Sequence, residues 1–260
     1  MDYIRPNILI NDVALSGKIR SELNVKEILL RGFLAGVLLS YATILAFTAA
    51  IETDINFIGA LVFPAGFVMV TLLGLELVTG SFALMPIAKL NKQTTTKRMF
   101  HNFSWAFIGN LIGGLFFALL FSYYIRHTAS PASLQMIEKV IATAEGKTIV
   151  YKADGKTGMV VLLIKAFLCN WMVTMGVIMS FTSSSTIGKT IAMWLPILIF
   201  FALGFEHAVV NMFIIPAGML LGADVTLFDW WFWNQIPVTI GNFISGFFFT
   251  GFLLHYMLKK

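Results

Sequence analysis

Long apolar stretches alternate with short polar ones along most of the chain. A helix needs about 20 predominantly apolar residues to cross a bilayer. Six segments meet that length, at residues 28–50, 56–88, 103–125, 158–181, 190–221 and 231–257. The pattern therefore predicts an all-α membrane protein with six transmembrane helices and the lipid bilayer as its surroundings.

The second and fifth segments are too long for one straight crossing. They contain 33 and 32 residues, which would extend to roughly 50 Å, whereas the hydrocarbon core is about 30 Å thick. Both include glycine, proline and polar residues along their length. We expect each to be a broken helix, interrupted near the bilayer centre at residues 77–81 and 207–211.

Composition supports this interpretation. Hydrophobic residues make up 58% of the 260 residues, charged residues only 12%, and the mean hydropathy is +0.85, whereas soluble domains carry about 25% charged residues. Residues 1–26 are too polar for a cleavable signal peptide. We expect residues 1–27 to be a cytoplasmic N-terminal segment, with a weakly amphipathic helix at 8–25, and residues 28–258 to form one transmembrane channel domain.

The basic residues indicate an orientation. With the N-terminus inside, the cytoplasmic side receives twelve lysines and arginines and the opposite side five, all of the latter in the loop at 126–157. Because basic residues favour the cytoplasmic side, we expect a multi-pass protein of the cell (inner or plasma) membrane with both termini cytoplasmic. Topology also explains the net charge of +5, so nucleic acid is not expected as a partner.

The two halves of the chain resemble each other. Residues 72–90 align with 202–220 without a gap, pairing Gly74 with Gly204, Glu76 with Glu206 and Pro86 with Pro216. Residues 108–120 match 240–252, and 30–36 match 164–170 more weakly, with a base in each at Arg31 and Lys165. Each half, at about 28–125 and 158–258, holds three segments and so enters the membrane from the opposite side. This predicts an inverted repeat with a permeation path between the two breaks.

His207 is the central candidate for chemistry. An ionisable group inside a membrane is expensive and is usually functional, and histidine exchanges protons near neutral pH. The alternative is a simple hydrogen bond to a neighbouring helix. The other histidines lie near segment ends, and the sequence has no HExxH motif, cysteine cluster or phosphate-binding glycine loop. We therefore expect no metal, no cofactor, no enzymatic activity and no ATP-driven pump.

Most of the remaining polar residues of the apolar segments are expected to be structural. We expect Glu76 and Glu206 to cap backbone N–H groups freed at the breaks, with a proton relay as the alternative. Thr79 offers a hydroxyl to an anion. The other candidates are neutral: Asn170 and Asn211 as donors, and Asn110 and Asn242, in paired IGN motifs, as anchors between helices.

The motifs GFEHAVVNMF at 204–213 and ELVTGS at 76–81, with the six-segment layout, resemble the formate/nitrite transporter family. The resemblance covers nearly the whole chain from residue 28 to residue 258. It implies an aquaporin-like fold, homopentamers with one pore per protomer, and passage of small monovalent anions such as formate, nitrite or hydrosulfide.

The resemblance also implies roles for individual residues. The pore histidine is His207, the loop threonine is Thr79, and the central asparagine is Asn170. The lysine of the outer vestibule falls on Lys156, with Lys152 as the second choice. Two hydrophobic constrictions fall on Phe63, Phe67, Val173 and Phe200, and on Leu77 and Val78 in the loop. Val78 stands where the family commonly has phenylalanine, which predicts a wider constriction.

These observations predict a channel or transporter for formate, nitrite or both, in which His207 assists protonation of the passing anion. A proton-coupled symporter of the same anions fits the sequence equally well. A neutral-solute channel like the aquaporins would carry paired Asn-Pro-Ala motifs, which this chain lacks. A membrane-embedded enzyme would need a second catalytic group beside His207, and the sequence offers none.

Overall fold

The computed structural model describes residues 2–128 and 130–258. Every regular secondary-structure element assigned within these ranges is a helix. The one β-type pairing described is an isolated bridge between Tyr3 and Ser183. The prediction of an all-α fold is confirmed.

Four continuous helical runs are long and apolar enough to cross a membrane: α2 (Val25–Thr53), α6 (Thr96–Arg126), the run Gly155–Thr182 formed by α9 (Gly155–Met179) and η1 (Ser180–Thr182), and the run Leu227–Leu258. The last comprises α12 (Leu227–Trp230), η2 (Trp231–Gln235), α13 (Ile236–Ile244), η3 (Ser245–Phe252) and α14 (Leu253–Leu258), of which η2 and η3 are π-helical. At most half of the most apolar window in each run is buried. The apolar remainder is suited to lipid, so the chain is a membrane protein.

The second and fifth apolar segments are interrupted, as their length predicted. The second consists of α3 (Asn56–Val62), α4 (Pro64–Leu72) and α5 (Val78–Leu90), and the fifth of α10 (Thr186–Ala202) and α11 (Ala208–Leu221). Phe63 alone separates α3 from α4, and the longer non-helical breaks are residues 73–77 and 203–207. The breaks therefore lie a few residues before the expected positions, and Val78 and Thr79 begin α5 rather than lying in a loop.

The early breaks follow from one glycine in each segment. Gly74 and Gly204 adopt left-handed φ angles of 63° and 64°, which glycine adopts without the steric cost of a side chain. The following residues close the helix ends with matching bonds, Leu75 N to Val70 O at 3.0 Å and Phe205 N to Phe200 O at 3.1 Å. This is the Schellman type of helix end. Chain direction then changes, and a new helix starts three residues later.

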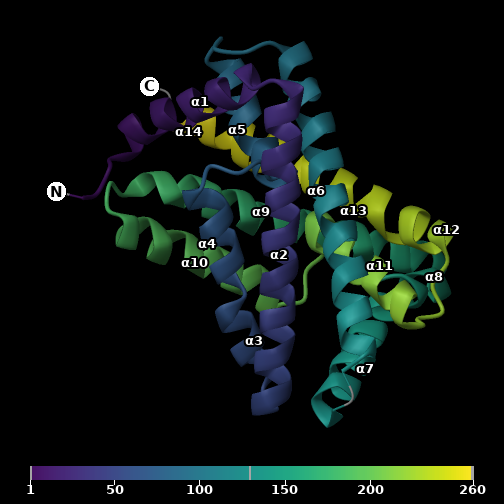
Figure 1. Ribbon diagram of the computed structural model, residues 1–260. Coiled ribbons are helices and arrows are strands. Elements are labelled where there is room, and N and C mark those ends of the chain that lie inside the picture. Colours follow the sequence, from purple (N-terminus) through teal and green to yellow (C-terminus); the bar gives the residue numbers. More distant parts are fainter. Residues whose placement is uncertain (1, 129, 259–260) are drawn as a thin grey trace.

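The half-helices α5 and α11 lie at the centre of the molecule, with residues 78–88 and 208–218 all buried. Helix α1 (Pro6–Glu22) packs on α5, and α7 (Pro131–Gly146) packs on α11. In Figure 1, α1 crosses beside α5 and α14, whereas α7 lies at the opposite end of α6. The expected loop at 126–157 thus contains α7 and the short α8 (Ile149–Ala153). Its buried residues Met136, Val140 and Ala144 recur every four positions, a helical signal that the sequence interpretation missed.

The N-terminal segment is part of the same packed unit. Helix α1 spans residues 6–22 instead of 8–25, and its Leu9, Ile10, Val13 and Ala14 belong to the central hydrophobic core. The N-terminal residues therefore contact the break region directly, which matters for the charges described below.

Candidate functional site

The starts of the two half-helices meet at one polar contact. Thr79 Oγ1 in the first turn of α5 lies 2.9 Å from His207 Nε2 at the N-cap of α11. Both side chains are buried, at 0% and 3% exposure. The breaks thus bring together two residues that are 128 positions apart in sequence.

The surroundings fix the hydrogen positions on this pair. The backbone N–H of Val210 donates to His207 Nδ1 at 3.2 Å, so Nδ1 acts as an acceptor and carries no proton. A neutral imidazole then has its proton on Nε2. His207 therefore donates to Thr79 Oγ1, and the hydrogen of the Thr79 hydroxyl is left for another acceptor.

Asn170 holds the backbone of Thr79 in place. Its Nδ2 donates to the carbonyl oxygens of Thr79 at 3.1 Å and of Asn242 at 2.7 Å. Asn170 is fully buried, and its Oδ1 has no protein partner among the described residues. The predicted central asparagine thus lies against the Thr79–His207 pair and presents a free acceptor.

The freed backbone groups at the breaks are satisfied by two asparagines. Asn110 Oδ1 accepts from Val78 N at 3.0 Å, and its Nδ2 donates to Glu76 O at 2.8 Å and Gly32 O at 2.9 Å. Asn242 makes the corresponding bonds to Ala208 N at 3.0 Å, Glu206 O at 3.0 Å and Ala166 O at 2.6 Å. A buried backbone group without a partner is costly, so each asparagine stabilises one break.

Glu76 does not cap backbone groups, which differs from the expectation. Its carboxylate accepts from side chains instead: Arg20 Nη1 at 2.6 Å, Asn102 Nδ2 at 3.1 Å and Ser81 Oγ at 3.5 Å. Asn110 accepts from the N–H of Val78, the first residue of α5. A fully buried carboxylate needs a cation in compensation, and helix α1 supplies it.

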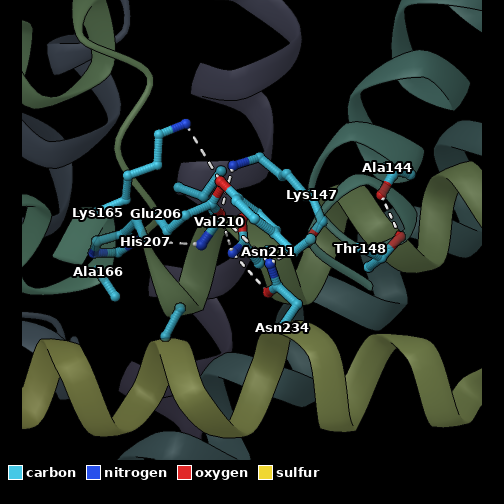
Figure 2. Close-up of polar contacts among 12 residues, drawn as sticks. Ala144, Lys147, Thr148, Lys165, Ala166, Glu206, His207, Val210, Asn211 and Asn234 are labelled. Carbon is cyan, nitrogen blue, oxygen red and sulfur yellow. Dashed lines mark hydrogen bonds and ion pairs between the residues drawn. The ribbon is translucent and has the colours of Figure 1, made fainter. Parts of the chain in front are cut away.

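Glu206 has a matching environment on the α7 side, and it too binds side chains rather than backbone N–H groups. It accepts from Lys147 Nζ at 2.9 Å, Tyr151 Oη at 3.0 Å and Asn211 Nδ2 at 2.8 Å. Asn211 in turn donates to Asn234 Oδ1 at 2.8 Å. Figure 2 shows Lys147, Asn211 and Asn234 around Glu206, next to His207. Burial, followed by the nearby Glu206 charge, raises the pKa of Tyr151, so its hydroxyl stays protonated and keeps donating to the carboxylate.

Each break borders a cavity. The α1-side cavity has a volume of about 230 Å³, and its lining includes Arg20, Phe67, Leu77, Val177 and Lys189. The α7-side cavity has a volume of about 310 Å³, and its lining includes Lys139, Lys147, Phe200, Val210 and His207. Both cavities have a mostly apolar lining, and both carry basic residues.

Aromatic rings close the α7-side cavity around the histidine. The Phe200 ring stacks on His207 with centroids 5.6 Å apart, and Phe63 packs edge-on against Phe200 at 5.7 Å. Phe67 and Leu77 line the α1-side cavity. Of the predicted constriction residues, Phe67, Leu77 and Phe200 thus line a cavity, and Phe63 packs against Phe200.

Other predicted site residues lie elsewhere. Val78 borders an outer apolar groove between α6 and α13, and Val173 is buried in the core. Lys152 pairs with Asp229 at 2.8 Å, Lys156 is exposed at the start of α9, and neither lines the α7-side cavity.

The lysines that do line the α7-side cavity are Lys139 and Lys147, which the sequence interpretation missed. Arg20 and Tyr151 were missed too. The signal that could have found such residues is the buried pair Glu76 and Glu206, because each buried carboxylate requires a cationic partner.

Relatives from two Bacillus species match almost the full chain. An uncharacterized transporter of Bacillus subtilis, YrhG, is 34% identical over 261 residues, covering 97% of this chain and 93% of its own. The formate channel BtFdhC of Bacillus thuringiensis is 31% identical over 258 residues, covering 97% and 95%.

Solved structures share the fold. One of an FNT family ion channel superposes with a TM-score of 0.81 at 24% identity, covering 96% of this chain and 98% of its own. The structure of a pentameric formate channel with formate bound superposes with a TM-score of 0.73 at 22% identity, covering 90% of this chain and 98% of its own.

One family model, described as formate/nitrite transporter, matches residues 7–256. The matched range includes both half-helices, Thr79, His207 and the two glutamates. This agrees with the resemblance drawn from the motifs at 76–81 and 204–213. The chain belongs to the formate/nitrite transporter family of membrane transport proteins.

Proposed function

We propose that this protein is a channel for small monovalent anions, formate and nitrite in particular, with the Thr79–His207 pair assisting protonation during passage. The observation that carries the proposal is the buried contact of 2.9 Å between these two side chains, with a cavity bordering each break. The full-length match to a formate channel supports formate as a substrate.

The energetic problem is desolvation. Moving an anion from water into an apolar constriction costs at least several kcal/mol. Phe67 and Leu77 on one side and Phe200 on the other form such surroundings. Burial disfavours the charged form of an acid, so an anion becomes easier to protonate as it leaves water.

The Thr79–His207 pair is suited to this step. The anion accepts the free hydrogen of the Thr79 hydroxyl, while His207 Nε2 donates to Thr79 Oγ1. A hydronium proton that enters from the α7-side cavity, which His207 borders, is taken up by His207 as Nε2 passes its own proton to Thr79 Oγ1 and the Thr79 hydroxyl passes its hydrogen to the anion. The anion becomes a neutral acid, and the hydronium is left as water. The neutral acid then crosses the apolar constriction at much lower cost.

Substitutions at the pair test the mechanism in proteoliposomes. Thr79→Val keeps the shape but removes the hydroxyl, and we expect formate flux to fall roughly ten- to hundredfold because a buried hydrogen bond is lost. Thr79→Ser keeps the hydroxyl and serves as the control with near-normal flux. His207→Phe should lower the flux and flatten its dependence on pH. An unchanged rate and pH profile in His207→Phe would exclude the mechanism.

We further propose that the chain has an aquaporin-like architecture of six spans in two inverted halves, 28–125 and 158–258, preceded by the segment 1–27. The paired breaks support this, because Asn110 and Asn242 make corresponding bonds in the two halves. Three spans per half would place Gln93 and Ala132, exposed in the links on either side of α6, on opposite membrane faces. The accessibility experiment described in the Discussion tests this.

We also propose a homopentamer in the cell membrane with one pore per protomer. Support comes from the fold shared with a pentameric formate channel and from the many large apolar side chains exposed on one protomer. A native mass measurement of the detergent-solubilised particle should give five chains of 28.9 kDa. A particle containing one chain would contradict the pentamer.

A further inference from the structure

We propose that each protomer binds a phospholipid with an anionic headgroup at a site along α6, with the headgroup on Lys97 and Arg98 and an acyl chain in the adjoining apolar groove. The groove is the one between α6 and α13 that Val78 borders. The site is separate from the Thr79–His207 pair and does not depend on the proposed transport of anions.

The apolar part of the site is a groove with a volume of about 470 Å³, lined by residues of α5, α6 and α13. Its lining is apolar apart from Ser104 and Thr239. Phe100, Ile108 and Ile240 belong to this lining and are between 37% and 50% exposed. An exposed apolar surface of this kind marks contact with a membrane or with another protein chain. In a bilayer, the groove therefore takes up an apolar occupant.

Packed phenylalanine rings give the groove a fixed shape. Phe82 meets Phe103 edge-on with ring centroids 5.1 Å apart and Phe243 at 5.3 Å, and Phe100 meets Phe103 at 5.8 Å. Phe82 and Phe103 are buried. Edge-to-face ring pairs stabilise one another, so these side chains hold their positions. The groove is thus preformed for a linear apolar group.

The groove has the depth of one bilayer leaflet. From Phe100 to Ile108, α6 rises about 12 Å at 1.5 Å per residue, and half of the hydrocarbon core is about 15 Å thick. Ile108 lies two residues before Asn110, which binds the backbone at the break before α5. Phe100 lies in the second turn of α6. Because the break is expected near the bilayer centre, the groove spans the acyl layer of the leaflet on the α1 side.

A basic pocket lies beyond the polar end of the groove. It has a volume of about 450 Å³, and its lining includes Lys97, Arg98, His101 and Glu22. Lys97 and Arg98 are exposed, and no ion pair within residues 2–128 and 130–258 involves either of them. Two bases face one carboxylate, so the pocket keeps a positive charge that suits a phosphate group.

The pocket and the groove are continuous along one face of α6. Lys97 and His101 line the pocket, and Ser104 and Ile108 line the groove. These positions follow one another at intervals of four, three and four residues, the spacing at which helical side chains lie on the same face. Positive charge at the water boundary therefore leads directly into an apolar channel. A phospholipid presents its charged headgroup and its acyl chain in this same order.

The basic end of the site favours a lipid over a second copy of the chain as the occupant. Another protomer could cover the apolar groove, but the pocket calls for an anion at the same end. Basic pockets beside transmembrane helices bind the headgroups of anionic lipids. The orientation expected from the basic residues places the site in the cytoplasmic leaflet, which carries the anionic lipids. Charge complementarity thus identifies an anionic phospholipid.

Lipid retention tests the headgroup part of the site. Purified protein is taken from nanodiscs that contain equal amounts of phosphatidylglycerol and phosphatidylethanolamine with identical acyl chains, and bound lipid is counted by native mass measurement. We expect the protein to retain phosphatidylglycerol preferentially, and Lys97→Gln combined with Arg98→Gln to reduce that preference about tenfold. Arg5→Gln combined with Lys89→Gln removes two exposed bases outside the pocket and is the matched control with unchanged preference.

The acyl part of the site is tested by filling the groove. Ser104 is exposed, and its hydroxyl bonds only to Phe100 O within α6, so Ser104→Trp should leave the core intact. We expect this variant to retain about one lipid fewer per chain, whichever lipid is offered. Leu119→Trp, at an exposed position of the same helix outside the groove, is the control with unchanged retention.

Three results would overturn the assignment. The first is equal retention of the two lipids by the unsubstituted protein. The second is a preference for phosphatidylglycerol that survives the loss of Lys97 and Arg98. The third is a Ser104→Trp particle that contains fewer chains but as much lipid per chain, because a second copy would then be the occupant of the groove. All three are measured without transport, so failure of the proposed anion channel leaves this test intact.

Discussion

At the residue scale, the two halves differ at one position of the breaks. Leu77 and His207 are the N-caps of α5 and α11 and have nearly the same backbone angles, with φ of −108° in both and ψ of 113° and 119°. The backbone therefore treats them alike. Only His207 adds a ring that accepts from Val210 N and contacts Thr79. His207 thus adds a polar ring at a position whose backbone conformation is the same in both halves.

Asn110 and Asn242, which bind the backbone at the two breaks, give a prediction at this scale. Asn110→Ala would leave the buried backbone groups Val78 N and Glu76 O without this partner and remove the additional bond to Gly32 O, and we expect a loss of roughly 2–5 kcal/mol. Asn242→Ala should cost about as much for the same reason. Thermal unfolding of the detergent-solubilised variants measures the effect. Asn24→Ala removes only the exposed cap of α2 and should cost about 1 kcal/mol; equal losses in all three would refute the argument.

At the element scale, α1 and α7 perform the same task although neither belongs to the sequence repeat. Helix α1 covers α5 and α7 covers α11. Arg20 in the last turn of α1 binds Glu76, and Lys147 directly after α7 binds Glu206. Each accessory helix thus packs on one half-helix and compensates its buried carboxylate. The breaks would otherwise hold an unpaired charge, which is strongly destabilising.

The contact between α1 and α5 can be tested with one methyl group. A Cβ at Gly17 would lie 2.4 Å from Leu84 O and 2.8 Å from the Cβ of Ala88. Gly17→Ala should therefore push α1 from α5 and destabilise the protein by about 1–3 kcal/mol. Gly146→Ala, in α7, meets no atom within 4 Å and should be neutral or stabilising. A comparison of their unfolding midpoints decides; a Gly17→Ala midpoint equal to that of the unsubstituted protein would contradict the close packing.

At the scale of the whole molecule, a cavity lined partly by basic residues borders each break, and the Thr79–His207 contact joins the two half-helices. Ion pairs in the described residues are confined to Arg20–Glu76, Lys147–Glu206 and Lys152–Asp229. The first two lie at the breaks, one on the α1 side and one on the α7 side. This distribution suits a path in which an anion is attracted at either end and protonated to a neutral acid in the middle.

The orientation of the whole molecule can be measured by thiol labelling. The single native cysteine, Cys169, is fully buried, so it should give little background. Gln93→Cys and Ala132→Cys place exposed thiols in the links before and after α6. A membrane-impermeant thiol reagent added to intact cells should label Ala132→Cys and leave Gln93→Cys unlabelled. The reverse pattern would place the termini outside, and equal labelling would contradict a single crossing by α6.

The sequence by itself determined the elements that depend on local patterns. Apolar length predicted an all-α membrane protein, and excess length together with the glycine, proline and polar residues of the second and fifth segments predicted the two interruptions. The repeated Glu76 and Glu206 identified the breaks as a pair, and the GFEHAVVNMF motif identified the family. These inferences succeed because the bilayer imposes a fixed length on helices and because glycine permits left-handed backbone angles.

Only the tertiary structure decided which side chains meet. It assigned the cations Arg20 and Lys147 to the glutamates, and placed Lys152 and Lys156 outside the lining of the α7-side cavity. It gave the backbone bonds to Asn110 and Asn242 instead of the glutamates. The physical reason is distance along the chain: these partners are tens of residues apart, and no local periodicity encodes them. The packing of α1 and α7 on the half-helices brings the cations to the glutamates.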